Sequence, residues 1–174
     1  MARNSYPVPV PAERSIPAGA WAASLWELED TRRRTLEAVS AMDPDTIDQV
    51  PAGFDNSIGA LLHHIALIEA DWLYADILAV DYPAWMLEVF PDDDRDQEGH
   101  LVPARRPLAS HLETLGLVRT ALLSALSDLP DSEFTMVRRE ASAQWVIHHL
   151  RQHEAEHRGQ IQSLVTALDY GRNL

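Results

Sequence analysis

The sequence predicts an all-α protein, a bundle of four long helices with an irregular excursion between the second and the third. Three observations lead to this prediction. Apolar residues recur with a period of about 3.6 residues in four long segments, prolines and polar runs separate these segments, and no stretch is convincing as part of a sheet. Because such bundles commonly hold metal sites between facing helices, polar side chains on the apolar stripes are the first candidates for function.

Four prolines in residues 1–17 predict an extended N-terminal arm, followed by a single domain over 18–174. The first helix is expected over 18–41. Its stripe includes two threonines and comprises Trp21, Leu25, Leu28, Thr31, Thr35 and Val39. Polar and proline-containing residues between 42 and 56 then interrupt the helical pattern.

The second helix is expected over 57–80, capped by Asn56 or Ser57. Its stripe comprises Leu61, Ile65, Ile68, Trp72 and Ala75. His64 lies at the edge of this stripe, whereas His63 lies about 100° away and is expected to face solvent.

After an irregular excursion over 83–98, which contains a helical turn at 84–90, the third helix is expected over 108–127. Its stripe comprises Leu108, Leu112, Leu115, Val118, Leu122 and Leu126. A brief extended segment at 134–138 leads to Ser142, the expected N-cap of the last helix. In that helix the shared face comprises Val146, Leu150, His153, His157, Ile161, Leu164 and Leu168.

Histidines recur at every fourth position of the last helix, as His149, His153 and His157. Residues four apart lie about 40° apart around a helix and about 6 Å along it, so two neighbouring imidazoles can share a metal ion. His149 and His157 are separated by about 12 Å of rise and cannot join one coordination sphere. A third ligand must come from elsewhere, and His64 is the obvious donor. Three protein nitrogens with an open position are the usual arrangement of a catalytic zinc-type site.

Composition excludes several kinds of chemistry. The chain has no cysteine, which excludes disulfides, thiolate metal ligands and a cysteine nucleophile. A formal net charge of −13 makes nucleic acid an unfavourable partner. The N-terminus lacks the apolar core of a signal peptide, and no apolar run reaches the ~18 residues of a membrane span. We therefore expect a cytoplasmic protein.

Several other side chains have both a functional and a structural interpretation. His149 could line a pocket or support a metal ligand, and its alternative is an ordinary partly buried histidine. Arg158 could attract an anionic substrate, but exposed arginines are common. For Gln160, the choice between a role in a pocket and an ordinary surface position is similarly open. Glu69 and Glu154 could orient the ligand imidazoles, although surface charge is the commoner role and is the one expected here.

Aromatic side chains could line a substrate pocket, but packing is the commoner role at helical spacing. We therefore assign Trp72, Tyr74, Trp85 and Trp145 to the core. The acidic run at 91–96 lacks the ligand order of a calcium loop and is interpreted as a solvated turn.

Two motifs resemble the DinB-like superfamily of bacterial helical-bundle proteins: Ser57-Ile-Gly-x-Leu-Leu-x-His64-Ile and Trp145-x-x-x-His149-Leu-x-x-His153-Glu-x-x-His157-Arg-Gly-Gln-Ile161. This superfamily includes the YfiT-like metal-dependent hydrolases, the bacillithiol transferases and the mycothiol-dependent enzymes. The order and spacing of the helices agree over positions 18–170. The resemblance implies a DinB/YfiT-like four-helix fold.

Carried over to this sequence, the resemblance implies that His64, His153 and His157 hold a divalent metal ion, zinc or nickel foremost. The mycothiol-dependent branch usually has glutamate at the position of His153, so the all-histidine pattern is more similar to the bacillithiol-transferase and YfiT-like branches. The resemblance also suggests a low-molecular-weight thiol as co-substrate, and relatives often form homodimers.

Two functions are consistent with these observations. In the first, the protein is an enzyme of the stress response, a thiol-dependent S-transferase or a hydrolase, whose metal ion activates a thiol or a water at neutral pH. In the second, the metal only holds helices together, and the bundle binds a small molecule or a protein partner without catalysis.

Overall fold

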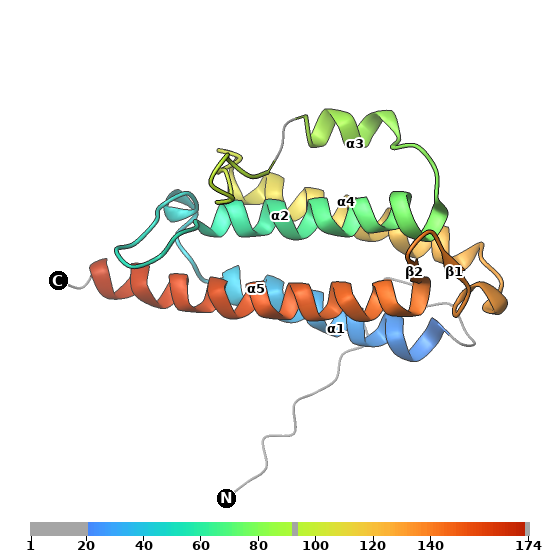
Figure 1. Cartoon of the computed structure of the whole chain (residues 1–174). Coiled ribbons are helices and arrows are strands. Elements are labelled where there is room, and N and C mark those ends of the chain that lie inside the picture. The colour runs from blue at the N-terminus through green and yellow to red at the C-terminus, as the bar shows by residue number, and fades with distance from the viewer. Residues whose placement is uncertain (1–20, 92–93, 173–174) are drawn as a thin grey trace, which may run out of the picture.

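The computed structural model describes residues 21–91 and 94–172. Four long helices run along the molecule (Figure 1): α1 (Ala22–Val39), α2 (Ile58–Asp71), α4 (Leu108–Ser127) and α5 (Ala143–Arg172). α5 packs against α1 and α2, and α2 also packs against α4. The all-α prediction is confirmed, whereas the arm predicted at 1–17 lies outside the described residues.

Short elements join the long helices. They are η2 (Pro44–Thr46), α3 (Ala84–Val89), η4 (Asp131–Glu133), β1 (Val137–Arg138) and β2 (Ala141–Ser142). β1 and β2 form an antiparallel hairpin with Val137 opposite Ser142. Ser142 then caps α5, because its Oγ accepts a hydrogen bond from the backbone N–H of Trp145 at 3.2 Å. The helical turn predicted at 84–90 is α3, and the predicted extended segment contains β1.

α2 begins at a capping serine and changes its helical form at its end. The Oγ atom of Ser57 accepts a hydrogen bond from the backbone N–H of Ala60 at 3.1 Å. From Trp72 the chain continues as a π-helix, η3 (Trp72–Leu78), which ends where Ala79 adopts a left-handed conformation with φ 54°. The continuous helix predicted over 57–80 is therefore two helical forms, and the wider turns change the direction of the side chains from Trp72 onward.

α2 packs against both α4 and α5, and this placement explains why the exposure predicted for His63 is wrong. The residue is only 8% exposed. Its ring lies 5.1 Å from the ring of Phe90 and 6.4 Å from that of His111, measured between centroids. The single apolar stripe of the sequence implied that the other face of the helix meets water, whereas side chains from α4 and from the end of α3 cover it.

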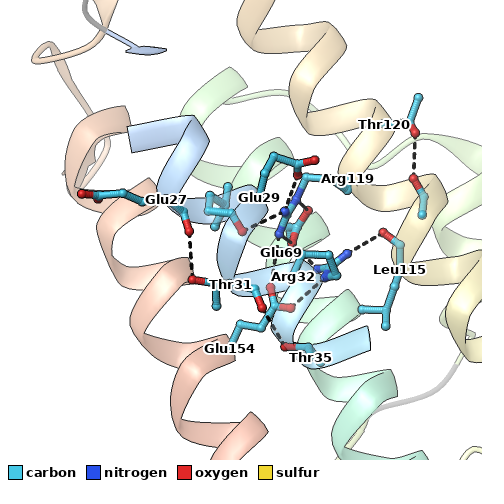
Figure 2. Close-up of polar contacts among 12 residues, drawn as sticks. Glu27, Glu29, Thr31, Arg32, Thr35, Glu69, Leu115, Arg119, Thr120 and Glu154 are labelled. Carbon is cyan, nitrogen blue, oxygen red and sulfur yellow. Dashed lines mark hydrogen bonds and ion pairs between the residues drawn. The ribbon is translucent and has the colours of Figure 1, made fainter. Parts of the chain in front are cut away.

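A buried polar network lies at the boundary between two apolar clusters of the core. One cluster surrounds α2 and the first half of α4, and the other lies toward the β-hairpin. Each long helix contributes to the network at this boundary (Figure 2), with Glu29 and Arg32 from α1, Glu69 from α2, Arg119 from α4 and Glu154 from α5.

Arg119 is the centre of this network and is fully buried. Its guanidinium donates to both carboxylate oxygens of Glu69, at 2.7 and 2.8 Å, and to Glu29 and Glu154, at 2.6 and 3.2 Å. Arg32 donates to Glu69 and Glu154 at 2.8 Å each. Burial alone would lower the pKa of Arg119, but the carboxylates, chiefly that of Glu69, raise it well above its ordinary value. The prediction that Glu69 and Glu154 are surface charges is wrong, since each side chain is 2% exposed.

Candidate metal centre

Three histidine side chains converge between α2 and α5. His64 comes from α2, and His153 and His157 lie one turn apart on α5. The Nε2 atom of His153 lies 3.1 Å from the Nε2 atom of His64 and 3.1 Å from that of His157. One nitrogen from each ring lies within 4.8 Å of the others. The fold thus brings together the three residues that the helical spacing and the family motif had selected.

Hydrogen bonds on the far side of two rings fix their tautomers. The Nδ1 atom of His64 bonds to the carboxylate of Asp94, and the Nδ1 atom of His157 donates to the amide oxygen of Gln160 at 2.9 Å. Because these oxygens act as acceptors, both rings carry their proton on Nδ1 and direct an Nε2 lone pair toward His153. A proton on His153 satisfies only one of the two lone pairs. A cation between the three nitrogens would satisfy both and the third ring as well.

The dimensions of the triad fit a divalent metal ion. Metal–imidazole bonds of about 2.0–2.1 Å imply nitrogen separations of about 3.0 Å at right angles and about 3.4 Å in a tetrahedron. The two separations of 3.1 Å lie in this range. Burial lowers the pKa of His64, and burial together with the neighbouring His157 and His64 lowers the pKa of His153 to about 3. Both rings are therefore in the neutral, metal-binding form at neutral pH.

Two residues next to His64 were missed by the sequence analysis. The interpretation of 91–96 as a solvated turn is wrong for Asp94, whose carboxylate bonds to the ring across 30 positions of sequence. The Nη2 atom of Arg95 lies 3.5 Å from His64 Nε2, and its Nη1 atom donates to the carbonyl of Gly99 at 2.7 Å. The only signal in the sequence was the acidic run itself, which says nothing about which helix it meets.

The other candidate residues lie at different distances from the triad. His149 is one turn from His153, with 6.0 Å between the ring centroids. Arg158 is partly exposed and follows the last triad residue on α5. Glu69 instead belongs to the buried network, where guanidinium groups hold both of its oxygens, so it is not placed to orient an imidazole.

The packing role assigned to the aromatic residues holds for Trp72, Tyr74 and Trp85 and is wrong for Trp145, which is 48% exposed. Its indole stacks on the ring of His149 with 5.0 Å between centroids and 7° between planes. Trp72 contacts both rings, at 5.4 and 5.2 Å. Tyr74 and Trp85 contact each other at 6.1 Å and pack against the apolar core as predicted.

Comparison with known proteins places the chain in a family. Within the part of the chain that the structure describes, no helix is both long enough and apolar enough to cross a bilayer. A search of curated proteins gives no match. A family model described as the DinB superfamily matches residues 27–161, which is more than half of the chain and includes all three triad histidines. The chain therefore belongs to the DinB superfamily.

Proposed function

We propose that the protein is a metal-dependent enzyme, a thiol-dependent S-transferase or a hydrolase, that acts through a divalent ion held by His64, His153 and His157. The observation that carries the proposal is the convergence of three imidazoles, in which the Nε2 atom of His153 lies 3.1 Å from the Nε2 atom of each of the other two rings. Such an ion would supply Lewis-acid activation of a thiol or a water at neutral pH. In a chain without cysteine, a thiol nucleophile has to come from a co-substrate.

The buried network favours catalysis over a purely structural metal. Arg32 and Arg119 join α2 to α5 through ion pairs with Glu69 and Glu154 (Figure 2). Glu154 directly follows the triad residue His153 on α5. A metal ion is therefore not needed to hold these two helices together. Because His153 and His157 are partly exposed, a substrate could reach an ion held by the triad, and this access favours a catalytic role.

The surrounding side chains have separate tasks in this proposal. Asp94 and Gln160 hold the rings of His64 and His157 in the orientation that directs Nε2 inward. Arg95 lies at the edge of the triad, where its guanidinium would bind an anionic group such as a thiolate or carboxylate brought by the substrate.

Zinc or nickel is the proposed ion, because neutral imidazole is a good ligand for both. A low-molecular-weight thiol is the proposed co-substrate of the transferase. A cytoplasmic location and a homodimer, both expected from the sequence and the family resemblance, also belong to the proposal. Sedimentation of the purified protein tests the dimer directly.

Activity is tested on metal-free protein reconstituted with zinc or nickel. A panel of cellular thiols is assayed with a chromogenic electrophile, and a chromogenic ester is assayed without thiol. The expected result is turnover that requires the metal and falls to background in His153→Ala, with the melting temperature of the metal-free protein retained. His148→Ala, at an exposed position of the same helix, is the matched control. Metal binding without turnover in either assay would favour the non-catalytic bundle.

A further inference from the structure

The helices α2 and α5 lie side by side (Figure 1). A row of rings leads away from the triad along this contact. On α5, His149 lies one turn before His153, and Trp145 lies one turn before His149. Trp72, at the end of α2, contacts both His149 and Trp145. Ring centroids are 6.0 Å apart from His153 to His149, and 5.0 Å apart from His149 to Trp145. Trp72 lies 5.4 Å from Trp145 and so completes an aromatic surface on the other helix.

This aromatic surface forms one wall of a cavity of about 440 Å³. The cavity is lined by Trp72, Val137, Glu140, Ala141, Ser142 and Trp145, so the β-hairpin supplies the opposite side. Trp145 is 48% exposed and Val137 is 65% exposed. An indole that is fixed by stacking and still exposed across half of its surface is well suited to contact a ligand, because its conformation is already ordered.

The position of the cavity relates it to the triad. Trp145 and His153 are eight residues apart on α5, which corresponds to about 12 Å along the axis. A molecule of that length can contact both. A larger cavity of about 580 Å³ lies between α1 and α4, but it is lined by charged and aliphatic side chains and includes none of the triad histidines.

Charge and shape define the chemical class of the ligand. The two indoles offer flat apolar faces, which favour an aromatic group in an offset-stacked or edge-on arrangement. Glu140 is the one charged residue among those lining the cavity, and its carboxylate disfavours an anionic group. Arg95, in contrast, lies at the triad and favours an anion there.

We propose that the cavity between Trp72, Trp145 and the β-hairpin binds an aromatic group without negative charge, at the end of a substrate whose reactive end lies at the histidine triad. This assignment deepens the proposed function and rests on it for the link to the triad. The aromatic site itself can be tested without any metal.

The first experiment titrates metal-free, ¹⁵N-labelled protein with 1-naphthylmethanol and follows the indole N–H signals of the five tryptophans. The signals of Trp72 and Trp145 are expected to shift saturably, while that of Trp85 stays in place. Trp145→Ala is expected to weaken binding about tenfold. Trp85→Ala is the matched control and is expected to leave the affinity unchanged. Shifts without saturation, or equal affinity in Trp145→Ala, would overturn the proposal.

The charge requirement is tested with 1-naphthoate, which has the same ring system and a carboxylate. It is expected to bind several-fold more weakly than the alcohol, and Glu140→Gln is expected to remove most of that difference. Trp145→Phe keeps a ring at this position and should retain most of the affinity, which separates the aromatic contact from any loss of folding. Tighter binding of the naphthoate would contradict the assigned class.

The second experiment tests the link to the triad in zinc-loaded protein. Acetohydroxamate, which binds metal alone, is compared with phenyl-alkyl hydroxamates of increasing chain length. Affinity is expected to rise about tenfold when the ring can extend about 12 Å from the hydroxamate, and Trp145→Ala should remove this gain without changing acetohydroxamate binding. A ring that adds nothing at any length would overturn the link. If naphthylmethanol binds but no hydroxamate does, the aromatic site stands and the proposed metal function is wrong.

Discussion

Asp94 has the most direct influence on the candidate centre of any residue outside the triad. Its carboxylate accepts the Nδ1 proton of His64 and so directs Nε2 toward the other two rings. Asp94→Asn is expected to weaken zinc binding about 10–100-fold, because an amide oxygen is a poorer acceptor and the amide can turn its NH₂ group to the ring. Competition with a zinc-sensitive dye measures the affinity.

Glu88→Gln is the control for this substitution, because it removes one carboxylate from an exposed position on α3, close to Asp94 in the sequence. Its zinc affinity should equal that of the unmodified protein. Equal losses in the two variants would show that general charge, and not the hydrogen bond to His64, supports the metal.

Because His111 is buried, we expect the free energy of unfolding to depend on pH in a specific way. Burial, with a smaller contribution from His63, lowers its pKa from 6.5 to about 4. In the unfolded chain the imidazole takes up a proton as the pH falls through about 6.5, whereas in the folded protein it stays neutral down to about 4. The unfolded state therefore binds more protons in this window, and the free energy of unfolding should decrease by up to about 3 kcal/mol on this account.

The measurement is urea denaturation of metal-free protein at pH 7 and pH 4. His111→Gln cannot take up this proton and should lose less stability between the two pH values than the unmodified protein. His148→Gln, at an exposed site, should show the full decrease. A decrease of the same size in His111→Gln would contradict the account of this residue.

At the scale of helices, the buried network determines how α1, α2, α4 and α5 fit together. Arg119→Met removes one guanidinium partner from Glu69 and Glu154, which keep Arg32, and removes the ion pair of Glu29 with Arg119. It should destabilise the protein by about 3–5 kcal/mol, as expected when a buried ion pair loses one member. Urea denaturation measures the loss. Arg138→Met removes a partly exposed pair with Glu133 and should cost no more than about 1 kcal/mol. Similar losses in both variants would mean that burial does not set the energetics of the network.

The start of α2 is held by a close approach at Gly59. A Cβ atom at this position would lie 2.6 Å from Oδ1 of Asp48 and 3.3 Å from Nε2 of His111. Gly59→Ala should therefore destabilise the protein by about 1–3 kcal/mol, although alanine is the better helix former by about 1 kcal/mol. Gly159→Ala on α5 meets no atom within 4 Å and should stabilise by about 0.5–1 kcal/mol. Thermal denaturation of the two variants checks the contrast, and a gain in both would contradict the packing at α2.

For the molecule as a whole, the features that could be predicted from the sequence are the local ones. Helical periodicity places His153 and His157 on one face, one turn apart, and the edge of the second stripe identifies His64. Each of these two placements depends only on the spacing of residues within one helix. The family motif then assigns the three histidines to one metal site.

The features that could not be predicted depend on contacts between distant segments. Glu69 and Glu154 look like surface charges until Arg32 and Arg119, each on another helix, are placed beside them. The hydrogen bond of Asp94 to His64 can be recognised only when the segment after α3 is seen to fold over α2. His63 is buried because α2 has neighbours on opposite faces, which a single apolar stripe does not reveal.

The central claim is that three imidazoles, from two helices, bind one divalent ion. The most direct measurement is zinc X-ray absorption on protein titrated to saturation and then freed of excess metal. The account predicts one zinc per chain with three imidazole nitrogens at about 2.0–2.1 Å, lost in His64→Ala, His153→Ala and His157→Ala and retained in His148→Ala. A chain that stays metal-free at saturating zinc and nickel, or that binds equally well without these histidines, would contradict it.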